Sequence, residues 1–285
     1  MPRPSDLRTR NYLYAVFALT WGMNLYLYLD GGYASGLVSI LLPIQMLIPG
    51  LVAIAFVRGE PHSLADYGMK FGRLRYYIAA YLLMVGSHAL HSLLAVLTGL
   101  GRFAGPGEGL ATIVPDLDIN PGLLLLLVFA ISPVQNILFG LGEEFGWRGY
   151  LVSRLLPHGL TPTILVSGFV WGLWHAPVIL MGHNFPEAPV PGVFAMILTS
   201  IPLGTIFIWL RLKSKSAIVV GFAHGTFNAT VFLGGVFVPE VGLFWTNPVG
   251  LTGFPVFAII AGLLFRLWPV DLPSPDPDAD MVATD

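Results

Sequence analysis

The stretch GLGEEFGWRGYL, residues 140–151, places two adjacent glutamates and an arginine inside a long apolar segment. Of the chain's 285 residues, 55% are hydrophobic and only 11% are charged, with a mean hydropathy of +0.75. A soluble domain normally carries charge on about a quarter of its residues. The composition therefore predicts an integral membrane protein, in which the charged side chains of 140–151 are costly to bury and are candidates for function.

The charge balance and the cysteine content exclude several classes of function. A net charge of -2 at pH 7 argues against a nucleic-acid partner. Because the chain has no cysteine, it has no disulfide, no thiolate metal site and no cysteine nucleophile. The expected partners are membrane lipid and a membrane-associated peptide or protein substrate.

Eight apolar segments are candidates for spanning helices, each of which needs roughly 20 mostly apolar residues. The segments are 11–29, 35–57, 76–99, a stretch within 121–156, 161–181, 192–211, 216–238 and 249–268. Their apolar runs are continuous rather than alternating, which favours helices over a β-barrel. The predicted fold class is all-α, a polytopic membrane protein with about eight transmembrane helices.

The basic residues predict the orientation of these helices. With the N-terminus inside, 13 of the 14 Lys and Arg residues lie on the inner side, and only Arg102 lies outside. The outer loops carry acidic residues such as Glu187 and Glu240. We therefore expect both termini in the cytoplasm and a multi-pass protein in a plasma membrane of bacterial or archaeal type.

The sequence divides into four expected regions. Residues 1–120 hold about three spans and no recognised motif, whereas 121–240 form a helical core with the candidate catalytic residues. A final transmembrane helix covers 241–268. The tail, 269–285, is acidic and proline-rich, a composition typical of disordered segments.

Four polar residues within the predicted spans fall at similar depths. These are Glu143, His175, His224 and Asn228. With a helical rise of about 1.5 Å per residue from the inner boundary, their depths range from roughly 14 to 21 Å. The hydrocarbon core is about 30 Å thick, so we expect these side chains to meet near its middle.

Helical spacing assigns a partner to the arginine. Glu144 and Arg148 are four residues apart, with the acid before the base, which favours an ion pair, and a buried arginine needs such a partner. Glu143 points about 100° away round the helix and is left without a cation. Beside imidazoles, such a carboxylate can take a proton from water. His224 and Asn228 are also four apart and share one helix face.

These residues resemble the motifs of the CPBP family of intramembrane proteases, also called Abi, which includes the type II CaaX prenyl endopeptidases. The family pattern is E-E-x-x-x-R, F-x-x-x-H and H-x-x-x-N/D on successive membrane helices. This chain has EEFGWR at 143–148, WGLWH at 171–175 and HGTFN at 224–228. Trp171 stands where the family has phenylalanine, and because an aromatic ring is retained, we expect little loss.

The resemblance implies an endopeptidase that hydrolyses a peptide bond of a membrane-associated or lipid-anchored substrate. It implies that Glu143 activates water with help from His175, and that His224 and Asn228 stabilise the oxyanion. A divalent metal such as Zn could instead be held by Glu143, His175 and His224, with an open position for water. The chain has no HExxH zinc helix, and we favour catalysis without a tightly bound metal, in which a Glu–His base acts with His–Asn donors.

Two other functions share part of this pattern. A proton-coupled transporter would use the same Glu and His residues as a proton relay, but the chain shows no internal repeat. A non-catalytic binding or self-immunity protein would not need every motif position, and all are retained. His88 and His91 match no family motif and are expected to be structural. His62, His158 and His183 are expected in solvated loops.

Overall fold

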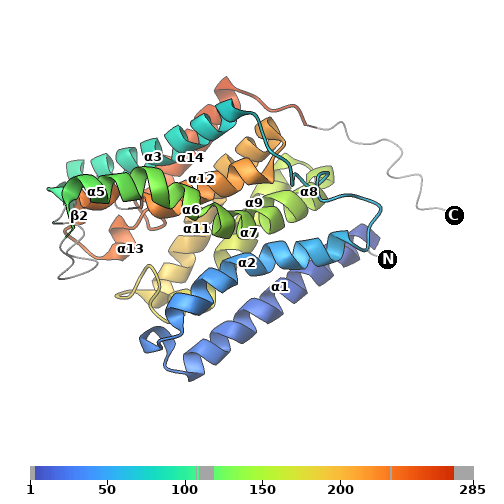
Figure 1. The fold of residues 1–285 in the computed structure, drawn as a ribbon, viewed down its shortest axis with the longest axis horizontal. Coiled ribbons are helices and arrows are strands. Elements are labelled where there is room, and N and C mark those ends of the chain that lie inside the picture. The colour runs from blue at the N-terminus through green and yellow to red at the C-terminus, as the bar shows by residue number, and fades with distance from the viewer. Residues whose placement is uncertain (1–3, 107, 109–118, 232, 273–285) are drawn as a thin grey trace.

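The computed structural model describes residues 4–106, 108, 119–231 and 233–272, and this part of the chain is almost entirely helical (Figure 1). Helices account for 75% of the residues and strands for 2%, so the predicted all-α class is confirmed. Most of the predicted tail, from 273 onward, lies outside the described residues.

The first three predicted segments form three long helices. These are α1 (Pro4–Leu29), α2 (Val38–Val57) and α3 (Leu74–Leu97), with a short 3-10 turn η1 (Gly32–Ala34) after α1. The first two pack against each other as an antiparallel pair, drawn in blue in Figure 1. Helix α3 lies apart from them, on the far side of the later helices.

The fourth predicted segment is a broken helix. Its parts are α5 (Pro121–Leu126), the π-helical turn η2 (Leu127–Ile131), α6 (Ser132–Gln135), α7 (Ile137–Glu144), the π-helical turn η3 (Phe145–Leu151), α8 (Val152–Leu155) and η4 (Leu156–His158). Its two halves are bent by 43° at residue 136. Pro133 lacks the N–H that would bond to the carbonyl of Phe129, and the Tyr81 hydroxyl donates to that carbonyl instead, at 2.8 Å.

The remaining helices follow the predicted segments, except that 161–181 is divided into two helices at His175 and 216–238 ends early. They are α9 (Leu160–Trp174), α10 (Ala176–Leu180), α11 (Pro189–Ser214), α12 (Ala217–Ala229), the turn η5 (Leu233–Gly235), α13 (Leu243–Thr246) and α14 (Gly253–Leu267). The prediction of one helix over 216–238 was wrong at its end. Helix α12 ends at Ala229, and positive φ at Leu233 and Gly235 is incompatible with a continued helix beyond it. Strand β2 (Phe237–Pro239) follows and pairs antiparallel with β1 (Gly101–Phe103).

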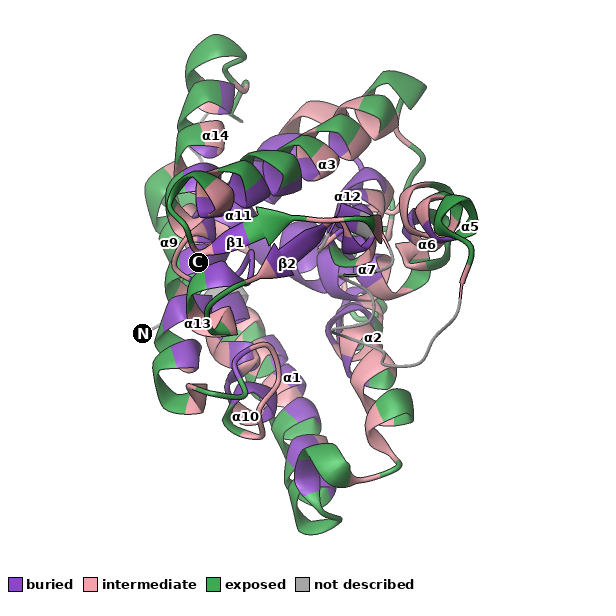
Figure 2. Ribbon diagram, turned by 90° about the vertical axis from the view of Figure 1, so that its left-hand side faces the viewer, coloured by how far each residue is buried: buried purple, intermediate pink, exposed green. Residues whose placement is uncertain are grey.

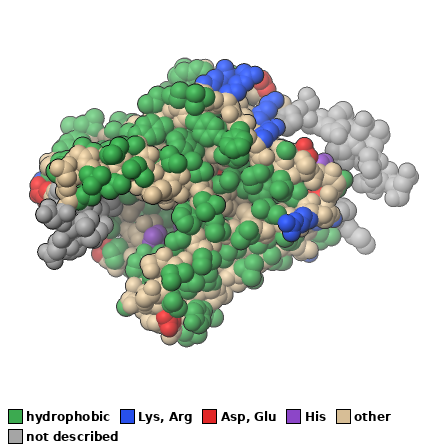
Figure 3. Space-filling view, viewed as in Figure 1, with side chains coloured by type: hydrophobic (Ala, Val, Ile, Leu, Met, Phe, Trp, Pro, Cys, Tyr) green, Lys and Arg blue, Asp and Glu red, His purple; other side chains and the backbone are tan. Residues whose placement is uncertain are grey.

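Integral membrane character is supported by the long apolar helices. Among the described residues, α2, α3 and α11 are long and apolar enough to cross a membrane, and the bent fourth segment makes a fourth at most. Helices α9, α12 and α14 are apolar but shorter. Figure 3 shows a largely hydrophobic face with Lys and Arg gathered toward its edges. The number of eight spans and the cytoplasmic termini stay predictions.

Helix α7 lies at the centre, between α2 on one side and α12 on the other (Figure 2). Small residues allow these close approaches. A Cβ on Gly140 would lie 2.3 Å from the carbonyl oxygen of Gly221 on α12, and a Cβ on Gly142 would lie 2.7 Å from the carbonyl oxygen of Met46 on α2. The backbones therefore touch directly, which brings the end of α7 against the middle of α12.

Candidate active site

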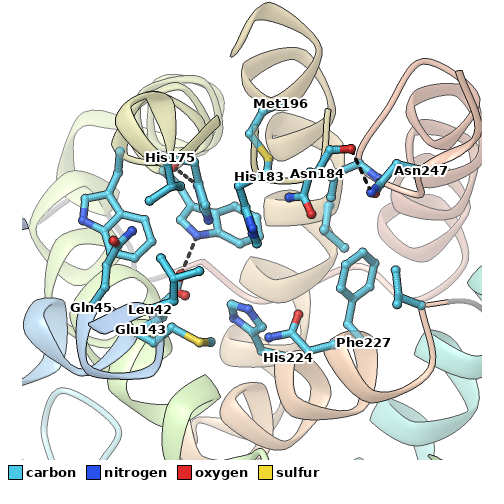
Figure 4. Close-up of a pocket in the computed structure, with 18 of the residues that line it drawn as sticks. Leu42, Gln45, Glu143, His175, His183, Asn184, Met196, His224, Phe227 and Asn247 are labelled. Carbon is cyan, nitrogen blue, oxygen red and sulfur yellow. Dashed lines mark hydrogen bonds between the residues drawn. The ribbon is translucent and has the colours of Figure 1, made fainter. Parts of the chain in front are cut away.

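The four predicted catalytic residues line one cavity of about 340 Å³. Glu143 comes from the end of α7, His175 from the junction of α9 and α10, and His224 and Asn228 from α12. In Figure 4, His175 and His183 face this cavity from one side, and Glu143 and His224 face it from the other. Apolar side chains such as Leu42, Met46, Val178, Met196 and Phe227 complete its wall.

Glu143 is 2% exposed and has no ion-pair partner among the described residues. Its Oε2 atom accepts a hydrogen bond of 2.8 Å from the indole Nε1 of Trp171. A phenylalanine at position 171 would have no such donor. The departure from the family pattern therefore adds a hydrogen bond to the carboxylate at the cavity.

Glu144 and Arg148 form an ion pair of 3.0 Å, and neither side chain is exposed to solvent. The guanidinium lies 4.2 Å from the ring centre of Trp171 and 5.2 Å from that of Phe207, in cation–π contact. A Cβ on Gly204 would lie 2.7 Å from its Nη2 atom, so the glycine leaves room for it. The pair lies behind the cavity wall rather than in it.

His224 joins this ion pair to the cavity. Its Nδ1 lies 2.8 Å from Glu144 Oε1, and because a carboxylate accepts, Nδ1 is the donor. Its ring is stacked on Phe207, with ring centres 5.6 Å apart. Its Nε2 has no hydrogen-bond partner within the described part of the chain. Asn228, one turn further along α12, is the more exposed of the two.

His175 has a corresponding arrangement at the end of α9. Its Nδ1 donates to the carbonyl oxygen of Trp171 at 2.8 Å, because a carbonyl can only accept. The neutral ring then carries its lone pair on Nε2, which has no partner in the described ranges. Trp174 contacts the ring edge-on, with ring centres 4.8 Å apart. Both histidines thus have a fixed Nδ1 and an available Nε2.

The loop after α10 supplies cavity residues that were not predicted. The prediction that His183 lies in a solvated loop was wrong, because it lines the cavity beside Asn184. Phe185, which is fully buried, anchors the loop. The Tyr33 hydroxyl lies 2.5 Å from His183 Nδ1, and burial lowers the pKa of His183 to about 4.

Gln45 and Asn247 also line the cavity and were missed. Gln45 lies on α2, is 3% exposed, and its Oε1 has no partner among the described residues. It is 13 residues from Arg58, or roughly 20 Å along the helix. The depth argument applied to the four predicted residues would have found it.

His88 and His91 on α3 do not line this cavity. Both are fully buried, and each ring contacts a threonine hydroxyl at 2.9 Å, that of Thr230 for His88 and that of Thr252 for His91. These bonds join α3 to the end of α12 and the start of α14, which agrees with the structural role expected for them.

The sequence left open whether Glu143, His175 and His224 hold a metal ion. In the ranges that the structure describes, no three His, Asp or Glu side chains are grouped closely enough to hold a metal ion. Glu143 Oε2 is also bonded to Trp171. As arranged, Glu143, His175 and His224 do not fit a three-ligand zinc site.

Comparison with known proteins gives two matches. The family model for type II CAAX prenyl endopeptidase Rce1-like proteins matches residues 121–230, which contain all three motifs. A protein of Methanococcus maripaludis, described as CAAX prenyl protease 2, is 25% identical over 228 residues, covering 73% of this chain and 78% of the relative. Both matches support a membrane protease of the CPBP family, and over the region that holds its three motifs the chain is similar to the type II CAAX prenyl endopeptidases.

Proposed function

We propose that the chain is an intramembrane endopeptidase that cleaves a membrane-associated, prenylated substrate at the cavity lined by Glu143, His175, His224 and Asn228. One observation carries this proposal: a buried carboxylate without a cation shares a cavity with two histidines whose Nε2 atoms are available. This set combines a base for water with donors for a carbonyl oxygen.

In the first step, Glu143 takes a proton from a water molecule as the water oxygen attacks the scissile carbonyl carbon. The π electrons of the carbonyl move onto its oxygen and give a tetrahedral oxyanion. His175, with its lone pair on Nε2, helps to orient the attacking water. The indole of Trp171 holds one oxygen of Glu143 and so fixes the direction of the carboxylate.

The oxyanion needs donors, and α12 provides them. His224 can donate from Nε2 while Nδ1 donates to Glu144. The ring is then positively charged and contacts the Glu144 carboxylate, which also pairs with Arg148. The amide of Asn228, on the same helix face, is the second donor. When the oxyanion collapses, the C–N bond breaks and Glu143 returns its proton to the departing amine. Water is consumed and the carboxylate is restored.

The rest of the cavity is suited to a peptide in an apolar setting. Carboxamides both donate and accept, as peptide groups do, and three line the cavity besides Asn228: Gln45, Asn184 and Asn247. Apolar side chains make up the remaining wall. The description of the archaeal relative as a CAAX prenyl protease supports a substrate whose prenyl group anchors it in the membrane.

The test is cleavage of a prenylated CaaX peptide by the purified full-length protein in proteoliposomes. We expect mass spectrometry to find release of the last three residues and, in H₂¹⁸O, one ¹⁸O atom in the new carboxyl group. The same peptide without its prenyl group is the control and should be cleaved far more slowly. The proposal is wrong if neither peptide is cleaved. Equal cleavage of both peptides would show that the prenyl group is not needed for substrate recognition.

A further inference from the structure

A second cavity lies outside the active site, on the surface between α3, α11 and α14. It measures about 470 Å³ and shares no residue with the catalytic cavity. Helix α11 packs against both other helices, and α14 also contacts α3. Figure 1 shows the start of α3 and the end of α14 meeting at one corner, where Figure 3 shows Lys and Arg side chains.

The interior of this groove is apolar and aromatic. Leu83 and Ala79 line it from α3, and the side chain of Trp209 lines it from α11. Trp209 donates from Nε1 to the carbonyl oxygen of Trp268 at 2.9 Å, which joins the ends of α11 and α14. From Arg75 to Leu83 the groove follows α3 for about 12 Å, which is within one leaflet of a hydrocarbon core about 30 Å thick.

Two cations stand at one mouth of the groove. Arg75 lies in the first turn of α3 and Lys213 in the last turn of α11, and neither pairs with a carboxylate among the described residues. Arg75 instead donates to the Tyr76 hydroxyl at 3.0 Å, and Lys213 donates to the Pro269 carbonyl. Trp268, which is 57% exposed, lies at the same end. Aromatic and basic side chains at one level are typical of the membrane–water interface.

We propose that this groove binds an anionic phospholipid. One acyl chain lies along Leu83 and Trp209, and the headgroup phosphate contacts Arg75 and Lys213. Charge complementarity favours an anionic lipid. A neutral lipid would fill the apolar interior of the groove but would leave Arg75 and Lys213 without counter-charge at its mouth. The predicted orientation places this mouth in the cytoplasmic leaflet, where anionic lipids attract basic side chains. The inference is independent of the proposed catalytic mechanism.

The test is native mass spectrometry of the full-length protein in detergent, titrated with phosphatidylglycerol or with phosphatidylcholine of the same acyl chains. We expect phosphatidylglycerol to bind roughly thirtyfold more tightly, since each Lys or Arg near an anionic surface contributes about 1 kcal/mol. The Arg75→Gln/Lys213→Gln variant should lose this preference. The Arg58→Gln/Arg266→Gln variant changes the net charge equally, does not alter the groove, and should keep it.

A further variant tests the apolar part of the groove. Ala79→Phe should weaken retention of both lipids, because the ring fills the space along α3, while thermal melting verifies that the variant is folded. Equal binding of the two lipids to the wild type would overturn the proposal. A preference for phosphatidylglycerol that survives in the Arg75/Lys213 variant, or that falls equally in the Arg58/Arg266 variant, would also overturn it. So would lipid retention that Ala79→Phe leaves unchanged.

Discussion

Two pairs of histidines occupy the same helical bundle in different surroundings. His88 and His91 are fully buried on α3, and each contacts a threonine hydroxyl of another segment. His175 and His224 each donate from Nδ1 to a fixed acceptor and line a cavity with Nε2 available. His224 is buried as His88 and His91 are, so burial alone does not mark a catalytic histidine. The cavity and the neighbouring carboxylates make the difference.

The largest effect on turnover is expected from substitutions of the two histidines at the cavity. Replacing His175 or His224 by alanine should lower the turnover number by about 10²–10⁴-fold, the usual contribution of a positioned acid–base group. His88→Ala and His91→Ala are the matched controls, and their turnover per folded molecule should be unchanged. The measurement is kcat on a prenylated peptide, corrected for the folded fraction. Similar losses of kcat in the variants of both pairs would show that the cavity histidines are not distinguished by a catalytic role.

Glu144 distinguishes His224 from the other histidines, and its replacement should affect stability most. Glu144→Gln leaves Arg148 buried without its counter-charge, which typically costs about 3–5 kcal/mol. Glu143→Gln is the control, because Glu143 has no ion pair to lose. Denaturant or thermal unfolding of the two variants gives the comparison. The assignment is wrong if Glu143→Gln destabilises the protein as much as Glu144→Gln does.

A substitution of Trp171 should have a smaller effect on turnover at the same cavity. Trp171→Phe removes the hydrogen bond to Glu143 and restores the family's residue. A hydrogen bond to a charged group contributes about 1.5–3 kcal/mol, so we expect kcat to fall about tenfold or more with KM unchanged. Trp209→Phe, outside the catalytic cavity, instead removes a bond of 2.9 Å to the carbonyl oxygen of Trp268 and should leave kcat unchanged. Unaltered kcat in Trp171→Phe would show that the indole does not position Glu143.

The smallest effect concerns the partners of the α3 histidines. Thr230→Val and Thr252→Val remove the hydroxyls that contact His88 and His91 without changing side-chain size. An interhelical hydrogen bond in a membrane protein contributes about 0.6 kcal/mol, so each variant should lower Tm by about 1–2 °C. Calorimetry measures this shift, and the cleavage rate should not change. A fall in rate without a fall in Tm would assign these histidines to the reaction.

The sequence predicted those features that depend on spacing along one helix. The four-residue interval gave the Glu144–Arg148 pair, and depth along each span brought Glu143, His175 and His224 to one cavity. Contacts set by the loops and by packing between helices were not predictable in this way. The loop that folds back on buried Phe185 places His183 at the cavity, and the approach of α9 to α7 gives the Trp171–Glu143 bond.

The apolar run after α12 shows a second limit. Residues 230–238 are as hydrophobic as a spanning helix, yet α12 ends at Ala229, Leu233 and Gly235 have positive φ, and β2 pairs with β1. The strand's partner lies more than 130 residues earlier in the chain, as in the pairing of Gly101 with Pro239. Hydropathy within one window carries no information about such a partner.

In the proposed mechanism, Glu143 activates the water that cleaves the substrate. The most direct measurement is single-turnover cleavage of a prenylated CaaX peptide by Glu143→Gln, in proteoliposomes matched to the wild type for folded protein. The amide cannot accept the proton of water, so we predict a rate lower by about 10³-fold or more, with unchanged thermal stability. Cleavage at the wild-type rate by a folded Glu143→Gln protein would contradict the account.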